Sequence, residues 1–277
     1  FLFMESDAIP SEEAQFEAYK KVAIALNGKP VIIRTLDIGG DKEIPYMGLE
    51  KDENPFLGYR AIRLCLDRKE DIYKPQLRAL LRASAYGNIR IMIPLVTCID
   101  ELREAKALIE EIKAELDEKN IAYKKDIQVG IMVETAAASL IADIFAKEAD
   151  FFSIGTNDLT QYTMSVDRGN KKVSYLYSTF NPAVLRSIRH IIACGREAGI
   201  MVGMCGEAAS DPMMIPLLLA FGLNEFSMSA SAILRARKMV TEYSVEELQA
   251  VADKAMSFAT TAEVEDYMRK FVEKITG

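Results

Sequence analysis

Residues 127–158, IQVGIMVETAAASLIADIFAKEADFFSIGTND, contain the pattern that decides the fold class. Two apolar, β-rich runs, Ile127–Glu134 and Phe151–Asn157, flank the segment Ala136–Lys147, in which apolar residues recur at helical spacing. A strand, a helix and a second strand in this order form a parallel pair, because the helix carries the chain back to the starting edge. This stretch therefore predicts one β-α-β unit of a parallel sheet.

The same alternation of strands and helices extends over the rest of the chain. Further β-rich runs are Val31–Ile38, Ile89–Val96, Met201–Gly206 and Glu225–Met228. Amphipathic helical segments are Ile99–Lys119, Asn181–Ala198 and Asp211–Phe221, and helix-start signals are found at Ser11, Asn181-Pro182 and Asp211-Pro212. Three more helical stretches follow Met228 and end at Lys274. We expect them to cover the sheet or to form an interface.

Six parallel strands that alternate with helices predict an α/β fold of the (β/α)8 TIM-barrel type. Eight strands are needed to close such a barrel, so we expect the first strand or two to lie upstream of this chain. The apolar residues Phe1–Met4 are interpreted as the tail of the second strand. Residues 1–277 are predicted to form one barrel domain, since barrels of about 250 residues are common.

Composition excludes several classes of function. The net charge is -7 and the pI is near 5.1, so neither nucleic acid nor an anionic membrane is expected as a partner. The longest apolar runs, such as Ile91–Val96 and Ile215–Leu219, are far shorter than the roughly 18 residues of a membrane span. Four widely separated cysteines indicate neither a disulfide framework nor a zinc site, and favour a reducing cytoplasm.

Two carboxylates stand at the ends of adjacent predicted strands. Glu134 ends the first strand of the opening stretch, and Asp158 follows the second. In barrel enzymes the loops after the strand C-termini build the active site. One or two protein carboxylates, with substrate oxygens and waters, are typical ligands of Mg²⁺. The alternative is that each acid caps the helix that follows it, and on the residues alone both interpretations stay open.

Several arginines also lie at strand ends. Arg34 lies within a strand otherwise suited to burial, and a buried guanidinium needs an anionic partner, either a ligand or Asp37. Arg60 and Arg168 follow in other loops, and their planar forks suit phosphate and carboxylate. Arg63 is interpreted as an ordinary solvated arginine. The loop Gly39-Gly40-Asp41-Lys42 permits close backbone approach but lacks nucleotide P-loop spacing.

Cys205 is the cysteine with a possible chemical role. It lies in the segment Gly203-Met204-Cys205-Gly206-Glu207 at a strand end, and an ordinary thiol, with a pKa of about 8.5, can give a proton to a carbanion. Cys65, Cys98 and Cys194 are interpreted as small buried residues. The single histidine, His190, lies in the middle of a predicted helix and is interpreted as structural. Motifs of the common hydrolases are absent from the sequence.

Five motifs together resemble one enzyme family. The run from Asp150 to Tyr162, DFFSIGTNDLTQY, resembles the signature of phosphoenolpyruvate-utilising enzymes. Its companions RTLDIGGDK from Arg34, NPFLGYRAIR from Asn54, GIMVET from Gly130 and GMCGE from Gly203 are similar to enzyme I of the bacterial sugar phosphotransferase system. The resemblance covers nearly the whole chain.

The resemblance implies a barrel that binds phosphoenolpyruvate and Mg²⁺, forms a homodimer, and works with a separate N-terminal domain that carries the phosphorylated histidine. It further implies transfer through that domain to the phosphocarrier protein HPr, as the first step of sugar transport, with pyruvate as product. Carried over by motif, Mg²⁺ would be bound by Glu134 and Asp158, and the general acid would be Cys205. Phosphoenolpyruvate would be bound by Arg34, Arg60, Asn157, Asp158 and Arg168.

Three alternatives stay open at this point. The chain can be the barrel of a pyruvate phosphate dikinase or a phosphoenolpyruvate synthase. It can also be an aldolase-type barrel, although aldolases do not need the Asn157-Asp158 signature in this form. Finally, without its histidine domain, the chain can act as a non-catalytic module for phosphoenolpyruvate binding and dimerisation.

Overall fold

The computed structural model describes residues 2–39 and 44–276, which fold as an α/β protein. All six predicted strands are present there, and each is shorter than its apolar run. The chain divides into two compact units, Phe1–Ile131 and Met132–Gly277, and the boundary falls within the third strand. The prediction of parallel strands that alternate with helices is confirmed, while closure of an eight-stranded barrel stays a prediction.

The first unit contains three parallel strands in the order β1-β2-β3. Ile91 of β2 lies opposite Ile33 of β1 on one side and Val129 of β3 on the other. The strands are β1 (Val31–Arg34), β2 (Ile89–Ile93) and β3 (Gln128–Val133). The α-helices are α1 (Glu12–Ala25), α2 (Ile62–Asp67), α3 (Lys74–Ser84) and α4 (Ile99–Glu118). Short 3-10 turns cover Pro45–Met47 and Pro55–Leu57, and a π-helical turn covers Lys69–Tyr73.

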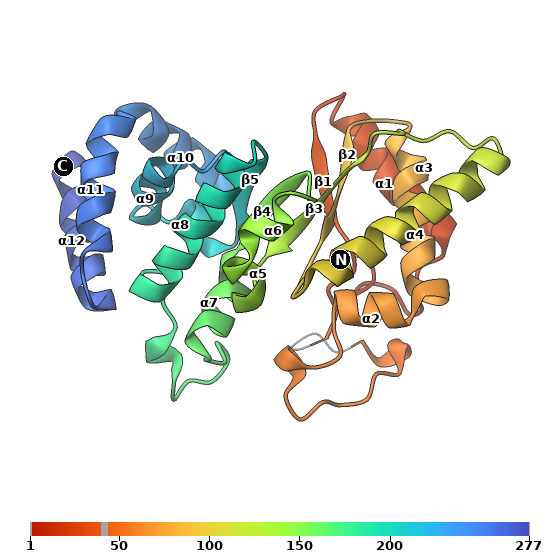
Figure 1. The fold of residues 1–277 in the computed structure, drawn as a ribbon, viewed down its shortest axis with the longest axis horizontal. Coiled ribbons are helices and arrows are strands. Elements are labelled where there is room, and N and C mark those ends of the chain that lie inside the picture. The colour runs from red at the N-terminus through yellow and green to blue at the C-terminus, as the bar shows by residue number, and fades with distance from the viewer. Residues whose placement is uncertain (1, 40–43, 277) are drawn as a thin grey trace. The chain divides into compact units, whose positions relative to one another are not determined.

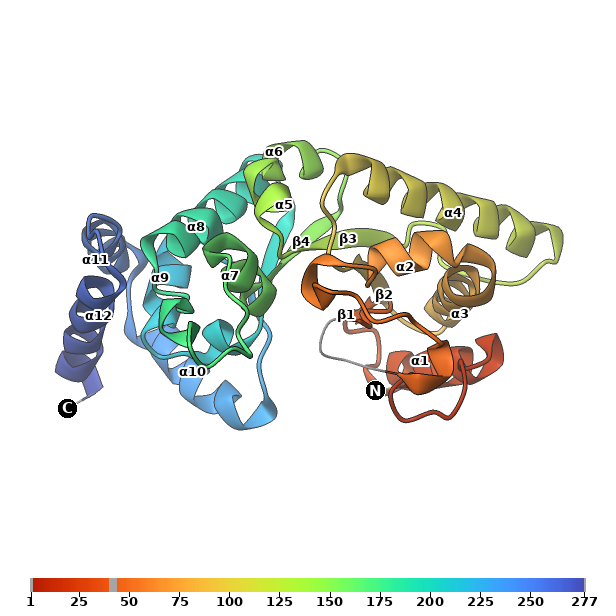
Figure 2. The ribbon, with the colours of Figure 1, turned by 90° about the horizontal axis from the view of Figure 1, so that it is seen from below.

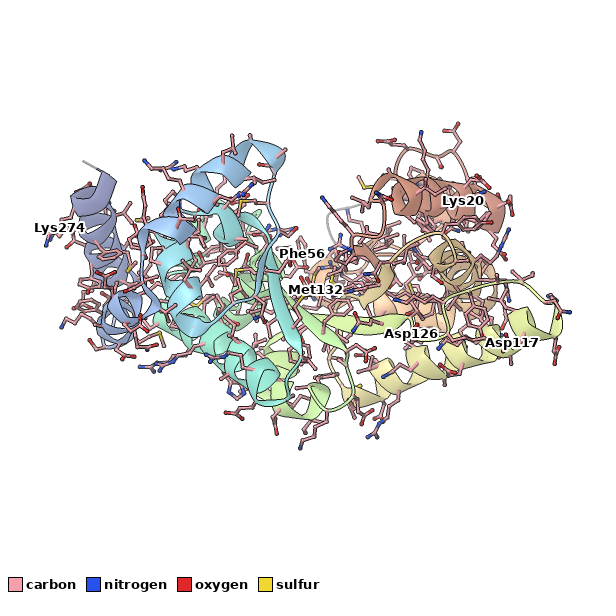
Figure 3. The ribbon with its side chains drawn as sticks, turned by 90° about the horizontal axis from the view of Figure 1, so that it is seen from above. Lys20, Phe56, Asp117, Asp126, Met132 and Lys274 are labelled. Carbon is pink, nitrogen blue, oxygen red and sulfur yellow. The ribbon has the colours of Figure 1, made fainter. Side chains whose placement is uncertain are left out.

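Local sequence signals explain where the elements of the first unit begin and how they pack. The Ser11 hydroxyl accepts a hydrogen bond from the Ala14 N–H at 3.2 Å, which confirms Ser11 as the N-cap of α1. Helix α1 packs on α3, which in turn contacts β2 (Figure 1). Figure 3 places Asp117 near the end of α4 and Asp126 on the connection to β3. Lys125 and Tyr123 both bond to Asp117, and these contacts hold that connection.

The second unit contains the parallel strands β4, β5 and β6 in this order. They are β4 (Phe151–Gly155), β5 (Met201–Cys205) and β6 (Glu225–Phe226). The helices are α5 (Ala136–Leu140), α6 (Ala142–Phe145), α7 (Thr156–Met164), α8 (Pro182–Glu197), α9 (Met214–Phe221), α10 (Ala230–Glu242), α11 (Val245–Met256) and α12 (Thr261–Thr276). Two 3-10 turns cover Ser174–Leu176 and Glu207–Ser210.

The core of the second unit lies between its strands and α8. Ile188, Ile191 and Ile192 of α8 are fully buried, and the helix contacts both β4 and β5. Asn181 is confirmed as the N-cap, because its side-chain oxygen accepts from the Ala183 N–H at 2.9 Å. At the C-terminus, the three predicted helices are present as α10, α11 and α12. Figure 2 shows α11 and α12 side by side, and α11 also contacts α9.

Three expectations about the elements are wrong. The segment 136–147 is interrupted at Ile141, whose backbone (φ -111°, ψ 27°) is not helical, so it forms two short helices. Asp211 does not cap α9, because its carboxylate accepts from the Met213 N–H in a turn and the helix begins at Met214. Residues 2–5 form a turn instead of the tail of a strand, and Phe1 lies outside the described residues.

Within the described residues, no helix combines the length and the apolar character that crossing a membrane requires. The longest described helix, α4, carries charged residues along much of its length.

Candidate functional site

In the first unit, two predicted arginines meet at one carboxylate. Asp37, which follows β1, has one oxygen 2.9 Å from Nη2 of Arg60 and the other 3.2 Å from Nη1 of Arg34. The side chains of Asp37 and Arg60 are each 4% exposed, whereas that of Arg34 is 37% exposed. The expectation that Arg34 is buried is wrong, although Thr35 and Leu36, which follow it, are buried. Two guanidinium groups therefore meet at one carboxylate, on which each makes a charge-assisted contact.

The backbone around Arg60 is shaped to admit its side chain. Gly39 has φ +108°, and a Cβ atom there would lie 2.5 Å from the Cβ of Arg60, so only glycine fits. The Ala61 N–H donates to the Ile38 carbonyl at 3.2 Å, which ties the two loops together. The guanidinium of Arg60 also lies 5.8 Å from the ring centroid of Phe56. Of the glycine loop predicted to approach a ligand, residues 40–42 lie outside the described residues.

A buried chain of hydrogen bonds supports the turn that carries Asp37. The side-chain oxygen of Gln76 accepts from the Leu36 N–H at 2.9 Å, and its amide nitrogen donates to the Tyr19 hydroxyl at 3.2 Å. Tyr19 donates to Gln15 at 3.2 Å, and Gln15 donates to the Pro10 carbonyl at 2.9 Å. Burial raises the pKa of Tyr19, so the phenol is neutral and donates. Helices α1 and α3 thus fix the backbone beside Asp37.

In the second unit, the side chain of Glu134 lies against Gly155 of the signature motif. Glu134 is only 2% exposed, and a Cβ atom on Gly155 would lie 2.5 Å from its Oε2 atom. The N-cap of α5 is the next residue, Thr135, whose hydroxyl accepts from the Ala138 N–H at 3.1 Å. The alternative that Glu134 occupies the capping position is therefore wrong. That this buried carboxylate binds a cation stays a prediction.

Asp158 is the second buried carboxylate of this unit. It lies in the first turn of α7, is 6% exposed, and has Oδ1 3.5 Å from Nη1 of Arg168. Gly155 occupies the N-cap position of α7, so Asp158 does not cap the helix, although its charge suits the helix N-terminus. Arg168 is held in turn through its backbone N–H, which donates to the Gln161 side chain at 3.1 Å.

Cys205 and Asn157 are brought to the same place. The Thr156 hydroxyl donates to the Cys205 carbonyl at 3.1 Å. Gly206 has φ +93°, and a Cβ atom there would lie 2.4 Å from the Thr156 hydroxyl and 3.3 Å from Oδ1 of Asn157. The half-buried thiol of Cys205 donates to the Ile154 carbonyl, with Sγ 3.7 Å from the oxygen. The residues after β5 therefore pack directly on the first turn of α7.

The second unit gathers five predicted site residues: Glu134, Asn157, Asp158, Arg168 and Cys205. The first unit gathers Arg34 and Arg60. That all seven act on one ligand stays a prediction. Nowhere in residues 2–39 and 44–276 do three or more His, Cys, Asp or Glu side chains form a group that could hold a metal ion. That Glu134 and Asp158 bind Mg²⁺, with substrate oxygens and water completing the coordination, stays a prediction.

Other predicted roles fall outside this site. Arg63 donates to the carbonyls of Leu57 (2.7 Å) and Gly58 (3.0 Å), so it is held by backbone instead of being merely solvated. Cys65 and Cys194 are buried, as predicted, but Cys98 is exposed because it occupies the N-cap of α4.

Sequence reasoning missed three residues around the site: Gln76, Tyr177 and Glu225. Tyr177 donates from its hydroxyl to the Asn157 carbonyl at 3.1 Å. Glu225 of β6 lies against β5, where a Cβ atom on Gly203 would come within 2.2 Å of its Oε2 atom, and burial raises its pKa. Gln76 could have been found as a polar residue among the buried leucines of α3. Glu225 could have been found as an acidic residue in an apolar strand.

Comparison with known proteins identifies the family of this chain. Residues 1–245 match the family model described as the PEP-binding domain of PEP-utilising enzymes. Curated relatives named phosphoenolpyruvate-protein phosphotransferase are 54% identical over 273 residues in Staphylococcus carnosus, 52% over 269 in Priestia megaterium and 53% over 270 in Bacillus subtilis. These alignments cover 97–99% of this chain but only 47–48% of each relative, so the chain spans about half their length. The chain belongs to the family of PEP-utilising enzymes and comprises their PEP-binding domain.

Proposed function

We propose that this chain is the substrate-binding part of a phosphoenolpyruvate-protein phosphotransferase, the first enzyme of a bacterial sugar phosphotransferase system. The observation that carries the proposal is that one unit places Glu134 against Gly155, Asp158 beside Arg168, and the Cys205 carbonyl on the Thr156 hydroxyl next to Asn157. The names of relatives at 52–54% identity favour this reading over a dikinase, a synthase or an aldolase.

Phosphoenolpyruvate carries a phosphate and a carboxylate, and both anions need charge-assisted donors. In this proposal Arg34, Arg60 and Arg168 supply those donors, and the side-chain amide of Asn157 adds a neutral one. Asp37 and Asp158 hold three of these side chains in place before the ligand arrives, which reduces the ordering that binding requires.

The bond between phosphorus and the enol oxygen breaks while a bond forms from phosphorus to a histidine nitrogen of the N-terminal domain in the longer protein. Mg²⁺, bound by Glu134 and Asp158, would neutralise charge on the phosphoryl oxygens. The arginines oppose the same charge. The enol fragment keeps the electron pair, Cys205 donates its proton to the methylene carbon to give pyruvate, and the thiolate then regains a proton from water. From that histidine the phosphoryl group would pass to HPr, in the cytoplasm, from an enzyme that acts as a homodimer.

Calorimetric titration of the 277-residue chain with phosphoenolpyruvate tests this proposal. We expect Mg²⁺-dependent binding that Arg34→Ala weakens about tenfold or more, the value of one charge-assisted contact. The matched control is Arg235→Ala, which removes an exposed arginine on α10. Equal affinity after Arg34→Ala and Arg235→Ala would show that the anion site is wrongly assigned.

A further inference from the structure

Tyr177 joins two parts of the candidate site that are separate in sequence. Its hydroxyl donates to the carbonyl of Asn157 at 3.1 Å, and it lies near enough to the guanidinium of Arg168 for that group to lower its pKa. Since a phenol has one donor and two acceptor positions, it can donate to the carbonyl and accept from the arginine at once. Tyr177 therefore fixes Arg168 relative to the turn that carries Asn157 and Asp158.

The surroundings of Tyr177 keep its hydroxyl neutral. Burial raises its pKa, with further upward contributions from Glu207 and Asp158, while Arg168 acts in the opposite direction. The ordinary pKa of tyrosine is already about 10, so the group keeps its proton at neutral pH. The proton stays available for the bond to the Asn157 carbonyl.

The backbone around Tyr177 is anchored to the C-terminal helix of the same unit. Ser178 donates from its hydroxyl to Oε1 of Glu265 at 2.9 Å, and the same hydroxyl accepts from the Phe180 N–H at 3.2 Å. Asn181, the N-cap of α8, reaches Thr261 at 3.4 Å. Both Glu265 and Thr261 belong to α12, the helix from which Lys274 projects in Figure 3. Because α12 meets the loop through these side chains, it holds the position of Tyr177.

We propose that Tyr177 is a positioning residue for Arg168 and Asn157, and that α12 sets its position through the contact between Glu265 and Ser178. This inference rests on the proposed function, since the bound group is the phosphate or carboxylate of phosphoenolpyruvate. The inference gives α12 a role in substrate affinity although α12 contributes no residue to the candidate site. If Arg168 samples several rotamers before binding, ordering it costs entropy and the affinity for the ligand falls, even when every contact in the complex is kept.

The test is the dissociation constant of phosphoenolpyruvate, with Mg²⁺ present, for variants of the 277-residue chain. Tyr177→Phe keeps the ring and removes the hydroxyl, and we expect it to weaken binding about three- to tenfold, the value of one or two hydrogen bonds. The matched control is Tyr175→Phe, two residues earlier and 79% exposed, which should bind like the unsubstituted chain.

Coupling to Arg168 separates positioning from a general loss of structure. In an Arg168→Ala background, Tyr177→Phe should have a smaller further effect on affinity, because one of the two residues that it positions is gone. An undiminished effect in that background would contradict the inference. Glu265→Ala should weaken binding, while Glu265→Gln, which retains an acceptor oxygen for Ser178, should restore most of it. Equal weakening by both Glu265 variants would overturn the role of α12.

The outcomes also distinguish this inference from the function on which it rests. Binding by the unsubstituted chain with no loss in Tyr177→Phe contradicts the inference and leaves the proposed function standing. No binding by the unsubstituted chain contradicts both. Should Tyr177→Phe lower the unfolding temperature much more than Tyr175→Phe does, the two Glu265 variants decide the matter, because they leave the phenol in place.

Discussion

The Oε2 atom of Glu134 lies only 2.5 Å from the position that a Cβ atom on Gly155 would occupy. The glycine of the Ser153-Ile154-Gly155-Thr156 run therefore has a steric function: it makes room for the buried carboxylate of Glu134. The Sδ atom of Met132 is also close, 2.9 Å from the same position. A side chain at residue 155 would therefore displace Glu134 and Met132, and moving closely packed side chains destabilises the fold.

Gly155→Ala should displace Glu134 and weaken Mg²⁺-dependent binding of phosphoenolpyruvate. The added methyl group should also lower the free energy of unfolding by about 1–3 kcal/mol, the usual cost of overpacking. Denaturant unfolding and calorimetry measure the two effects. In the double variant Gly155→Ala/Glu134→Ala, part of the stability should return while Mg²⁺-dependent binding does not. Unchanged binding in Gly155→Ala would show that the position of Glu134 does not matter.

Gln76→Ala should destabilise the first unit. It leaves the Leu36 N–H without its acceptor, and a buried group without a partner costs about 1–3 kcal/mol. Denaturant unfolding should show this loss, and calorimetry should show weaker binding because the turn that carries Asp37 is less well fixed. The control is Gln249→Ala on the surface of α11, where we expect a change within about 0.5 kcal/mol. A loss in Gln76→Ala as small as that of the control would contradict the proposed support.

The half-buried carboxyl group of Glu225 gives a pH-dependent prediction. Burial raises its pKa above the ordinary value of 4.5, so the native state holds the proton more tightly than the unfolded state does. Its contribution to stability is therefore full below pH 4.5 and is lost as the pH rises from there through the raised pKa.

At neutral pH the partly buried, ionised carboxylate of Glu225 destabilises the native state, and Glu225→Gln removes this destabilisation. We expect a higher free energy of unfolding than that of the unsubstituted chain at pH 7, and this gain should shrink as the pH falls through the raised pKa toward 4.5 and vanish below it. Unfolding curves at several pH values give the comparison, with Glu118→Gln at the exposed end of α4 as control. A gain that is the same at all pH values would rule out the titration of Glu225 as its cause.

Cys205→Ser should leave phosphoenolpyruvate binding within about twofold but slow pyruvate formation by about 10²-fold or more in the complete enzyme, because a hydroxyl is a weaker acid than a thiol. The exposed Cys98→Ser is the matched control. Rapid-quench measurement of pyruvate, with binding followed separately, resolves the two effects. Normal turnover in Cys205→Ser would remove Cys205 from the role of general acid.

The strands and their order of appearance could be predicted because each is an apolar run long enough to be recognised. Their ends could not, since the burial of a side chain at a strand end depends on what packs around it. Thr35 still donates to the Met92 carbonyl at 2.9 Å and is buried, as is Leu36, whereas the side chain of Arg34 just before them is 37% exposed. The break at Ile141 was equally invisible, because the apolar pattern continues through it.

The motif residues of the site could be predicted, whereas the residues that hold them could not. Asn157, Asp158 and Cys205 belong to recognisable sequences. Tyr177 and Gln76 act through bonds to backbone atoms 20 and 40 positions away in the chain, and no local pattern encodes such a contact. The prediction that Cys98 is buried was wrong for a similar reason. Its exposure is determined by its position at the start of α4 and not by the chemistry of the thiol.

The central claim is that Glu134 and Asp158 hold a cation required for phosphoenolpyruvate binding. Calorimetric titration of the 277-residue chain with phosphoenolpyruvate, with and without Mg²⁺, tests it most directly when Glu134→Gln is measured in parallel. The account predicts tight binding only with Mg²⁺, and a loss of this dependence in Glu134→Gln. Binding that is equally tight without Mg²⁺, or Mg²⁺ dependence that survives Glu134→Gln unchanged, would contradict it.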